Sequence, residues 1–138
     1  MAHWSDDLIG LPWKEKGRGR EGTDCWGLVR LAFAEKRKIG LPSYHDAYAS
    51  TLDCEAIEHT IDHEMAGLVE RVEPADVLPW DFVLMREGDQ AVHVGLVTTP
   101  GRMLHIERGQ TSGVVRLSDA EFRLRIVGFF RLTGVLDA

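Results

Sequence analysis

Apolar residues in the first half of the chain repeat at the spacing of α-helices. Between residues 28 and 33 they fall on one face, shortly after Asp24, whose side chain can cap a helix. This pattern predicts a helix over about residues 24–38, ended by Gly40-Leu41-Pro42. A second apolar stripe, with acids and histidines on the remaining faces, predicts a helix over about residues 52–66.

Beyond residue 80 the spacing changes toward alternate residues, which is the period of β-strands. Runs rich in Val, Leu, Ile and Phe, bounded by Gly, Pro or Asp, predict five strands over residues 81–86, 92–98, 102–107, 114–117 and 125–132. Ser118 and Glu121 have the spacing of a capping box for a brief helical turn. Helices followed by antiparallel strands indicate an α+β fold, and a chain of 138 residues without repeats or linkers indicates one domain, 1–138.

The composition is that of an ordinary globular protein. Hydrophobic residues make up 44% and charged residues 28%, and the net charge of −6 argues against a nucleic-acid partner. No apolar run reaches the length of a signal peptide or a membrane helix, so we expect synthesis in the cytoplasm without an export signal and no membrane insertion. Two cysteines can form one disulfide at most, and a reducing compartment is the simpler assumption.

One cysteine occupies a position that favours reactivity. Cys25 follows the predicted cap Asp24, so it lies in the first helical turn, where free backbone N–H groups and the helix dipole stabilise a thiolate. A nucleophilic cysteine needs a base and a third group that orients the base. His93 and His105, in two neighbouring predicted strands, are the candidates, although apolar neighbours allow each to be a core histidine instead.

The loop between these two strands decides whether the histidines can meet. A two-residue turn at Pro100-Gly101 would place them on opposite faces of the sheet. A five-residue loop, 98–102, would place them on one face, with Glu107 directly across from His93 as an alternative orienting residue. We predict the five-residue loop, because the residue before a proline favours an extended conformation.

Three motifs occur in the order Cys, His, His: Gly22-Thr23-Asp24-Cys25-Trp26-Gly27-Leu28-Val29-Arg30, then His93-Val94-Gly95-Leu96-Val97, then Leu104-His105-Ile106. Together they resemble the NlpC family of papain-like cell-wall cysteine peptidases. The first motif and the preceding Gly10-Leu11-Pro12-Trp13 are similar to those of small members found in tailed-phage tails and gene-transfer particles.

This resemblance implies a papain-like fold, with N-terminal helices packed on a central antiparallel sheet of about five strands. It implies Cys25 as nucleophile, His93 as general base and His105 as the residue that orients His93. It also implies hydrolysis of peptidoglycan stem peptides, commonly between D-γ-glutamyl and a diamino acid. The residues themselves indicate acyl transfer by a thiolate, and they do not indicate that substrate.

The chain departs from the family at two places near the expected site. Trp13 stands where the family usually has Tyr, so an indole N–H would donate at the oxyanion site but could not accept. Pro79-Trp80-Asp81 stands for Pro-Gly-Asp, and its Trp either reshapes a cleft wall or fills the core. Asp24 and Trp26, beside the nucleophile, are expected at the oxyanion site or cleft, with Trp26 mainly packing.

Other polar residues are either candidates for binding or part of a solvated surface. Arg18 and Arg20 lie in a basic loop beside the nucleophile and are candidates for binding a substrate carboxylate. His59 and His63 have a spacing that can hold a metal, but they lie opposite the apolar stripe, so we expect a solvated face. Cys54 is expected to be a bystander thiol. We predict no metal and no cofactor.

The resemblance predicts a cysteine peptidase of the phage-tail type. Its expected partners are peptidoglycan stem peptides and phage-like tail hub or tip proteins, with the particle carrying it to the periplasm or cell wall of the target cell. Two alternatives remain open. One is a structural tail-tip protein that keeps the fold with little or no activity, and the other is a thiol amidase or acyltransferase on the same scaffold.

Overall fold

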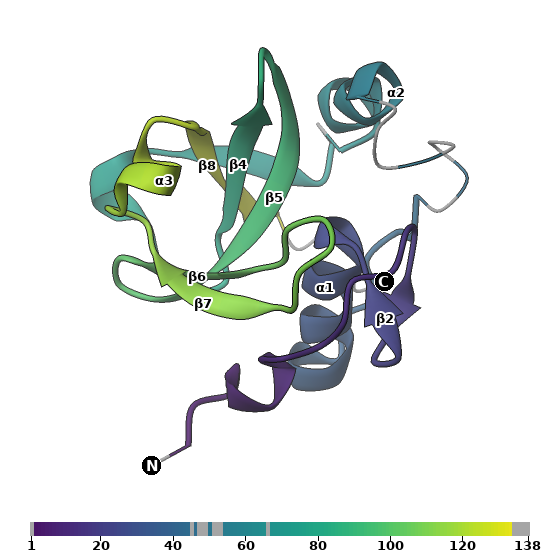
Figure 1. The fold of residues 1–138 in the computed structure, drawn as a ribbon. Coiled ribbons are helices and arrows are strands. Elements are labelled where there is room, and N and C mark those ends of the chain that lie inside the picture. The colour runs from purple at the N-terminus through teal and green to yellow at the C-terminus, as the bar shows by residue number, and fades with distance from the viewer. Residues whose placement is uncertain (1, 45, 47–49, 51–53, 66, 134–138) are drawn as a thin grey trace.

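The computed structural model describes residues 2–44, 46, 50, 54–65 and 67–133. A six-stranded antiparallel sheet, in the order β3-β8-β4-β5-β6-β7, forms its centre (Figure 1). The strands are β3 (Val69–Val72), β4 (Phe82–Glu87), β5 (Gln90–Thr99), β6 (Arg102–His105), β7 (Gly113–Arg116) and β8 (Ile126–Leu132). The predicted α+β class is confirmed.

Short helices surround this sheet. The longer ones are α1 (Cys25–Ala32), which continues as the π-helical η2 (Phe33–Arg37), and α2 (Cys54–His59), which continues as the π-helical η3 (Thr60–Glu64). The others are η1 (Asp6–Leu8), η4 (Pro74–Asp76) and α3 (Ala120–Arg123). None of the helices described here combines the length and the apolar composition that crossing a bilayer requires.

The predicted helix over residues 24–38 is present, but a different residue ends it. Lys38 adopts a left-handed conformation with φ of 58°, and the N–H of Ile39 donates to the carbonyl of Phe33 at 3.1 Å. This local reversal terminates the helix two residues before Gly40. In the second predicted helix, residues 52, 53 and 66 lie outside the described part of the chain.

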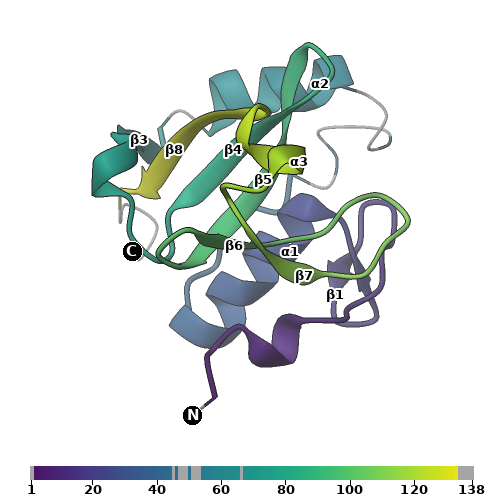
Figure 2. The same cartoon turned by 60° about the vertical axis from the view of Figure 1, so that its left-hand side comes forward.

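Both faces of the sheet are covered. Leu28 and Phe33 of the α1–η2 helix pack against one face, with Leu96 of β5 and Leu104 of β6. On the other face, Phe122 of α3 packs against side chains of β4, β5 and β6: Val83, Met85, Val97 and Met103. Figures 1 and 2 show α1 and α3 on opposite sides of β5. This packing holds the start of α1 beside the middle of the sheet.

The β5–β6 hairpin has the predicted register but not the predicted loop. Thr99 pairs with Arg102, so the turn has two residues, and the register shifts between Val97 and Thr99. Thr98 is therefore a β-bulge, and beyond it Leu96 pairs with Leu104. Because the bulge adds one residue to one strand, it reverses the effect of the even turn. The five-residue loop was wrong, and the shared face of the two histidines is confirmed.

Two parts of the sheet region were not predicted. β3 adds a sixth strand, paired with β8 at the edge; its sequence Val-Glu-Arg-Val carries too few apolar residues to show a strand pattern. The basic loop that carries Arg18 and Arg20 contains a small hairpin of β1 (Arg18–Gly19) and β2 (Gly22–Thr23). Strands of two residues are too short for any periodicity.

Trp80, the second departure from the family pattern, fills space away from the expected nucleophile. Its ring stacks on Trp4 with centroids 4.0 Å apart and meets the edge of Phe33 at 4.9 Å. Its backbone has φ of 79°, a conformation that glycine adopts at low cost and a bulky residue rarely does. Of the two alternatives, core filling is therefore the one that the structure supports.

Gly27 allows α1 to lie against the β1–β2 hairpin. A Cβ atom there would overlap the carbonyl oxygen of Gly17 and the hydroxyl of Thr23. We expect Gly27→Ala to lower the free energy of unfolding by about 3 kcal/mol, because backbone must move to make room. Urea denaturation measures this change, with Gly40→Ala as the matched control, since Gly40 has open space around its Cα. Equal stability of the two variants would contradict the close approach.

Candidate active site

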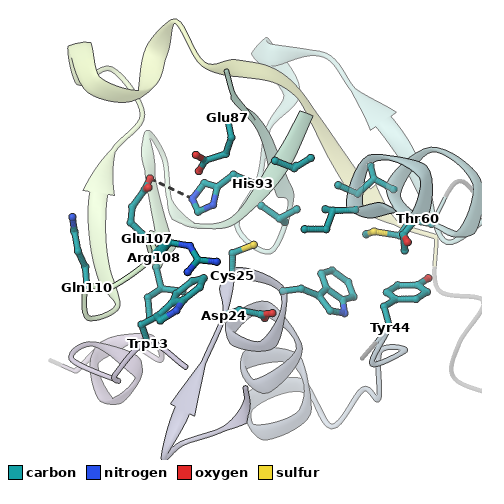
Figure 3. Close-up of a pocket in the computed structure, with 17 residues that line it drawn as sticks. Trp13, Asp24, Cys25, Tyr44, Thr60, Glu87, His93, Glu107, Arg108 and Gln110 are labelled. Atoms are coloured by element: carbon teal, nitrogen blue, oxygen red, sulfur yellow. Dashed lines mark ion pairs between the residues drawn. The ribbon is translucent and has the colours of Figure 1, made fainter. Parts of the chain in front are cut away.

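Cys25 begins α1 and faces a cavity. The carboxylate of Asp24 accepts a hydrogen bond from the N–H of Gly27 at 2.8 Å, which caps the helix as predicted. This cap fixes Cys25 in the first turn, at the wall of a cavity of about 240 Å³ between α1, α2 and β5 (Figure 3). The polar residues lining the cavity include Asp24, Tyr44, Thr60, Glu87, His93, Glu107, Arg108 and Gln110.

The two predicted histidines meet on one face of the sheet. His93 Nε2 lies 3.4 Å from His105 Nδ1, and both imidazoles are buried. Gly95 lies two residues after His93 on β5, where a Cβ atom would come within 2.8 Å of the Met103 sulfur. A glycine at this position leaves room for the Met103 side chain. Figure 3 shows His93 above Cys25 at one end of the cavity.

Glu107 also lies beside both histidines. Its Oε1 atom is 3.6 Å from His93 Nε2 and 3.8 Å from His105 Nδ1. Arg125 Nη1 donates to the same carboxylate oxygen at 3.2 Å, and its Nη2 donates to Glu87 at 3.2 Å. The structure thus places both candidate orienting residues, His105 and Glu107, on the Nε2 side of His93. This leaves Nδ1 as the ring nitrogen available to the thiol.

Burial keeps both reacting groups uncharged. It raises the pKa of the Cys25 thiol to about 12, and the negative charge of Asp24 acts in the same direction. The N–H groups of Val94 and Trp26 oppose this rise but do not cancel it, so the thiolate stabilisation expected in the first helical turn is outweighed by burial. Burial also lowers the pKa of His93 to about 4, against the attraction of Glu107. Near neutral pH the site therefore holds a thiol and a neutral imidazole, and a thiolate forms only as its proton passes to a base.

Arg18 and Arg20 are held by local hydrogen-bond acceptors. Arg18 is largely buried and donates to Asp24 Oδ1 at 2.8 Å and to the carbonyl of Ser43 at 2.9 Å. Arg20 pairs with Asp7 and Glu35 on the exposed surface. Neither arginine is among the described residues that line the cavity. The hairpin that carries them turns their guanidinium groups toward these local acceptors, and their role in binding a substrate carboxylate stays a prediction.

The two tryptophans of the predicted cleft do line the cavity. Trp26 Nε1 donates to the carbonyl of Pro42 at 2.8 Å, which agrees with a packing role. The ring of Trp13 lies 5.6 Å from the guanidinium of Arg108, and Arg108 pairs with Glu15 at 2.7 Å. Arg108 is a basic side chain at the cavity that the sequence analysis missed. Its position three residues after His105 could have indicated that its side chain lies near the cavity.

The remaining candidates lie outside the cavity. His59 and His63 are exposed, with ring centroids 4.3 Å apart, as expected of a solvated helix face. Cys54 begins α2, and its side chain lies outside the described part of the structure.

The sequence matches the model of the NlpC/P60 family over residues 10–131. The chain belongs to this family. The NlpC/P60 match includes Cys25 and His93, which line the cavity, and His105, which contacts His93. A search of curated proteins found no match.

Solved structures share the NlpC/P60 fold at low sequence identity. The chain is 17% identical to the NlpC/P60 domain of the peptidoglycan hydrolase SagA, with a TM-score of 0.62. The match covers 93% of the present chain and 92% of the SagA domain. A protein from Staphylococcus aureus, similar to lipoproteins of the NLP/P60 family, has 17% sequence identity and a TM-score of 0.65. That match covers 94% of the present chain and 39% of the S. aureus protein. An NlpC/P60 family protein from Bacillus cereus has 18% sequence identity and a TM-score of 0.64, and the match covers 90% of the present chain and 36% of the B. cereus protein. The chain thus spans well under half of the last two proteins.

The charge of Asp24 is expected to hold Cys25 in its protonated form. Asn in its place keeps a capping oxygen but removes the charge, so we expect Asp24→Asn to lower the pKa of Cys25. Alkylation by iodoacetamide at pH 8, in a Cys54→Ala background, should accelerate about tenfold for each pKa unit. Asp7→Asn, an exposed acid outside the cavity lining, is the control. An unchanged or slower rate for Asp24→Asn would contradict this electrostatic role.

Proposed function

We propose that this protein is a cysteine peptidase that hydrolyses peptide bonds of peptidoglycan. The observation that carries the proposal is the meeting of Cys25, at the start of α1, with His93 in one cavity, backed by His105 and Glu107. The NlpC/P60 match and the fold shared with the domain of the hydrolase SagA support the substrate class.

We propose a role for each group in acyl transfer. His93 Nδ1 accepts the proton of the Cys25 thiol while the sulfur forms a bond to the substrate carbonyl carbon. The carbon–nitrogen bond then breaks, and the amine leaves with the proton from His93. Water, deprotonated by His93, attacks the thioester and releases the acid and the free thiol. His105 fixes the orientation of the His93 imidazole by contacting its Nε2 atom, and Glu107 lies beside both rings.

The D-γ-glutamyl–diamino acid bond is the proposed point of cleavage. The family resemblance supports this choice, and the charged side chains of the cavity suit a charged stem peptide. Arg108, beside Trp13, carries the guanidinium that would bind a substrate carboxylate in place of Arg18 and Arg20. The indole N–H of Trp13 is proposed to donate near the oxyanion, where the family usually has a tyrosine hydroxyl.

We also propose that the protein works as part of a phage-like tail, bound to hub or tip proteins. In this setting it is synthesised in the cytoplasm and reaches the periplasm or cell wall of the target cell with the particle. The support is the similarity of the first motif, and of Gly10-Leu11-Pro12-Trp13, to small tail-associated members. Detection of the protein in purified particles, co-purifying with a tail hub protein, would test this setting, and its absence from particles would contradict it.

The first test of the activity is digestion of purified peptidoglycan and defined muropeptides, with mass spectrometry of the products. We expect new amino termini, and the fragment masses identify the cleaved bond. Transfer of the acyl group to an added amine, without hydrolysis, would indicate the acyltransferase alternative. The same substrates left intact by folded protein, both alone and within particles, would support a structural role instead.

A further inference from the structure

Three potential ligand atoms beside the cavity form a triangle of nearly equal sides. His93 Nε2 and His105 Nδ1 are 3.4 Å apart, and Glu107 Oε1 lies 3.6 Å from the first and 3.8 Å from the second. The three atoms lie within 4.8 Å of one another as a possible metal-binding group. A point equidistant from all three lies about 2.1 Å from each, which is the length of Zn–N and Zn–O bonds.

We propose that His93, His105 and Glu107 bind one Zn²⁺ ion, or a similar transition-metal dication, and that the bound ion blocks the thiol chemistry. Two imidazole nitrogens and one carboxylate oxygen are a ligand set that zinc accepts. Tetrahedral coordination needs the three atoms to approach by only a few tenths of an ångström. His93 and Glu107 line the cavity, so a fourth position can face its interior.

The charges around the triangle both favour and oppose a cation. Glu87 and Glu107 are acidic, and Arg125 lies between them with hydrogen bonds of 3.2 Å to each. Because Arg125 donates to the same Glu107 oxygen that the ion would use, it competes with the metal. Its second hydrogen bond, to Glu87, can remain when the ion takes Glu107. We therefore expect Arg125→Gln to bind the ion more tightly than the wild type.

The blocking effect rests on the proposed function and follows from the lone pairs of His93. Coordination through Nε2 requires that the proton of the neutral ring sit on Nδ1. Nδ1 is the nitrogen left to accept the thiol proton of Cys25, so a zinc-bound His93 cannot act as its base. Hydrolysis should therefore stop at one equivalent of Zn²⁺ and return when EDTA removes the ion.

The binding test does not depend on catalysis. Zn²⁺ alone is titrated into wild-type protein against a chromophoric chelator, which reports stoichiometry and affinity. We expect one tight site that weakens at least about tenfold in His105→Ala and in Glu107→Gln and remains in Cys25→Ala. The control is His59→Ala/His63→Ala, which removes an exposed histidine pair on η3 and α2 and should leave the tight site intact.

Two outcomes would overturn the proposal. Loss of the tight site in the His59/His63 double variant, with His105→Ala unchanged, would place the ion on the helix surface. Loss in Cys25→Ala would make the thiol a ligand and reject the assigned set. Circular dichroism of each variant confirms folding, and Arg125→Gln supplies a gain of affinity that unfolding cannot imitate. Intact zinc binding without peptidoglycan hydrolysis would refute the proposed peptidase and leave the metal site standing.

Discussion

Cys25→Ala is expected to lower the rate of peptidoglycan hydrolysis by about 10⁴-fold or more, because the covalent route has no other nucleophile. The methyl group of alanine cannot form the thioester, and neither His93 nor Glu107 can replace it at the start of α1. The fold should survive, since the cap of α1 depends on Asp24 and Gly27. The measurement is the initial rate of amino-terminus release, with products identified by mass.

Cys54→Ala is the matched control for this loss. It removes the other cysteine of the chain and should leave the rate near that of the wild type. A thiol-specific reagent should correspondingly inhibit wild type and Cys54→Ala alike, with the label on Cys25. Residual hydrolysis in Cys25→Ala, or inactivation by Cys54→Ala instead, would refute Cys25 as the nucleophile.

The position of Cys25 could be predicted because local rules determine it. A capping aspartate followed by apolar residues at helical spacing defines a helix start, and in the structure Asp24 makes this cap by accepting from the Gly27 N–H. The register of His93 against His105 was predicted for a partly wrong reason. An even turn combined with a bulge at Thr98 gives the same register as an odd loop, and the sequence does not distinguish them.

The arginines show where sequence reasoning fails. Arg18 is close to Cys25 along the chain, but the β1–β2 hairpin directs it to Asp24 and Ser43. Arg108 is distant along the chain, yet it reaches the cavity beside Trp13 because it follows β6. Sequence distance does not report such tertiary proximity. Charged edge strands such as β3 cannot be predicted for another reason. Such a strand is paired on one edge and little buried, so its sequence shows no alternation of apolar and polar residues.

His93→Gln is expected to lower the rate of hydrolysis by about 10²–10⁴-fold, the range for loss of a general base. Glutamine can still donate and accept hydrogen bonds within the buried site, but it does not take up the thiol proton. The rate is measured at pH 7 with EDTA present. His59→Gln, an exposed histidine outside the cavity lining, is the matched control and should leave the rate unchanged. A His93→Gln rate within a few-fold of wild type would remove His93 from the proposed mechanism.

The same variant should also change how stability depends on pH. Burial lowers the pKa of His93 to about 4, with Glu107 opposing and the positive charges of Arg125 and His105 assisting. In the unfolded chain the pKa returns to about 6.5, so the unfolded state binds this proton first as the pH falls. Stability contributed by the neutral His93 is therefore present above pH 6.5 and is lost between about 6.5 and 4.

Over that interval the loss attributable to His93 amounts to about 3 kcal/mol of unfolding free energy. Urea denaturation in EDTA at pH 7 and pH 4 should show the wild type losing that much more stability than His93→Gln. His105, whose pKa burial also lowers, remains in the variant and accounts for part of any slope that persists. Comparing the slopes separates proton binding from packing, because a packing defect in the variant lowers the free energy of unfolding equally at pH 7 and at pH 4. Parallel slopes for wild type and variant would show that His93 titrates in the folded protein as it does in the unfolded chain, and the lowered pKa of His93 would have to be abandoned.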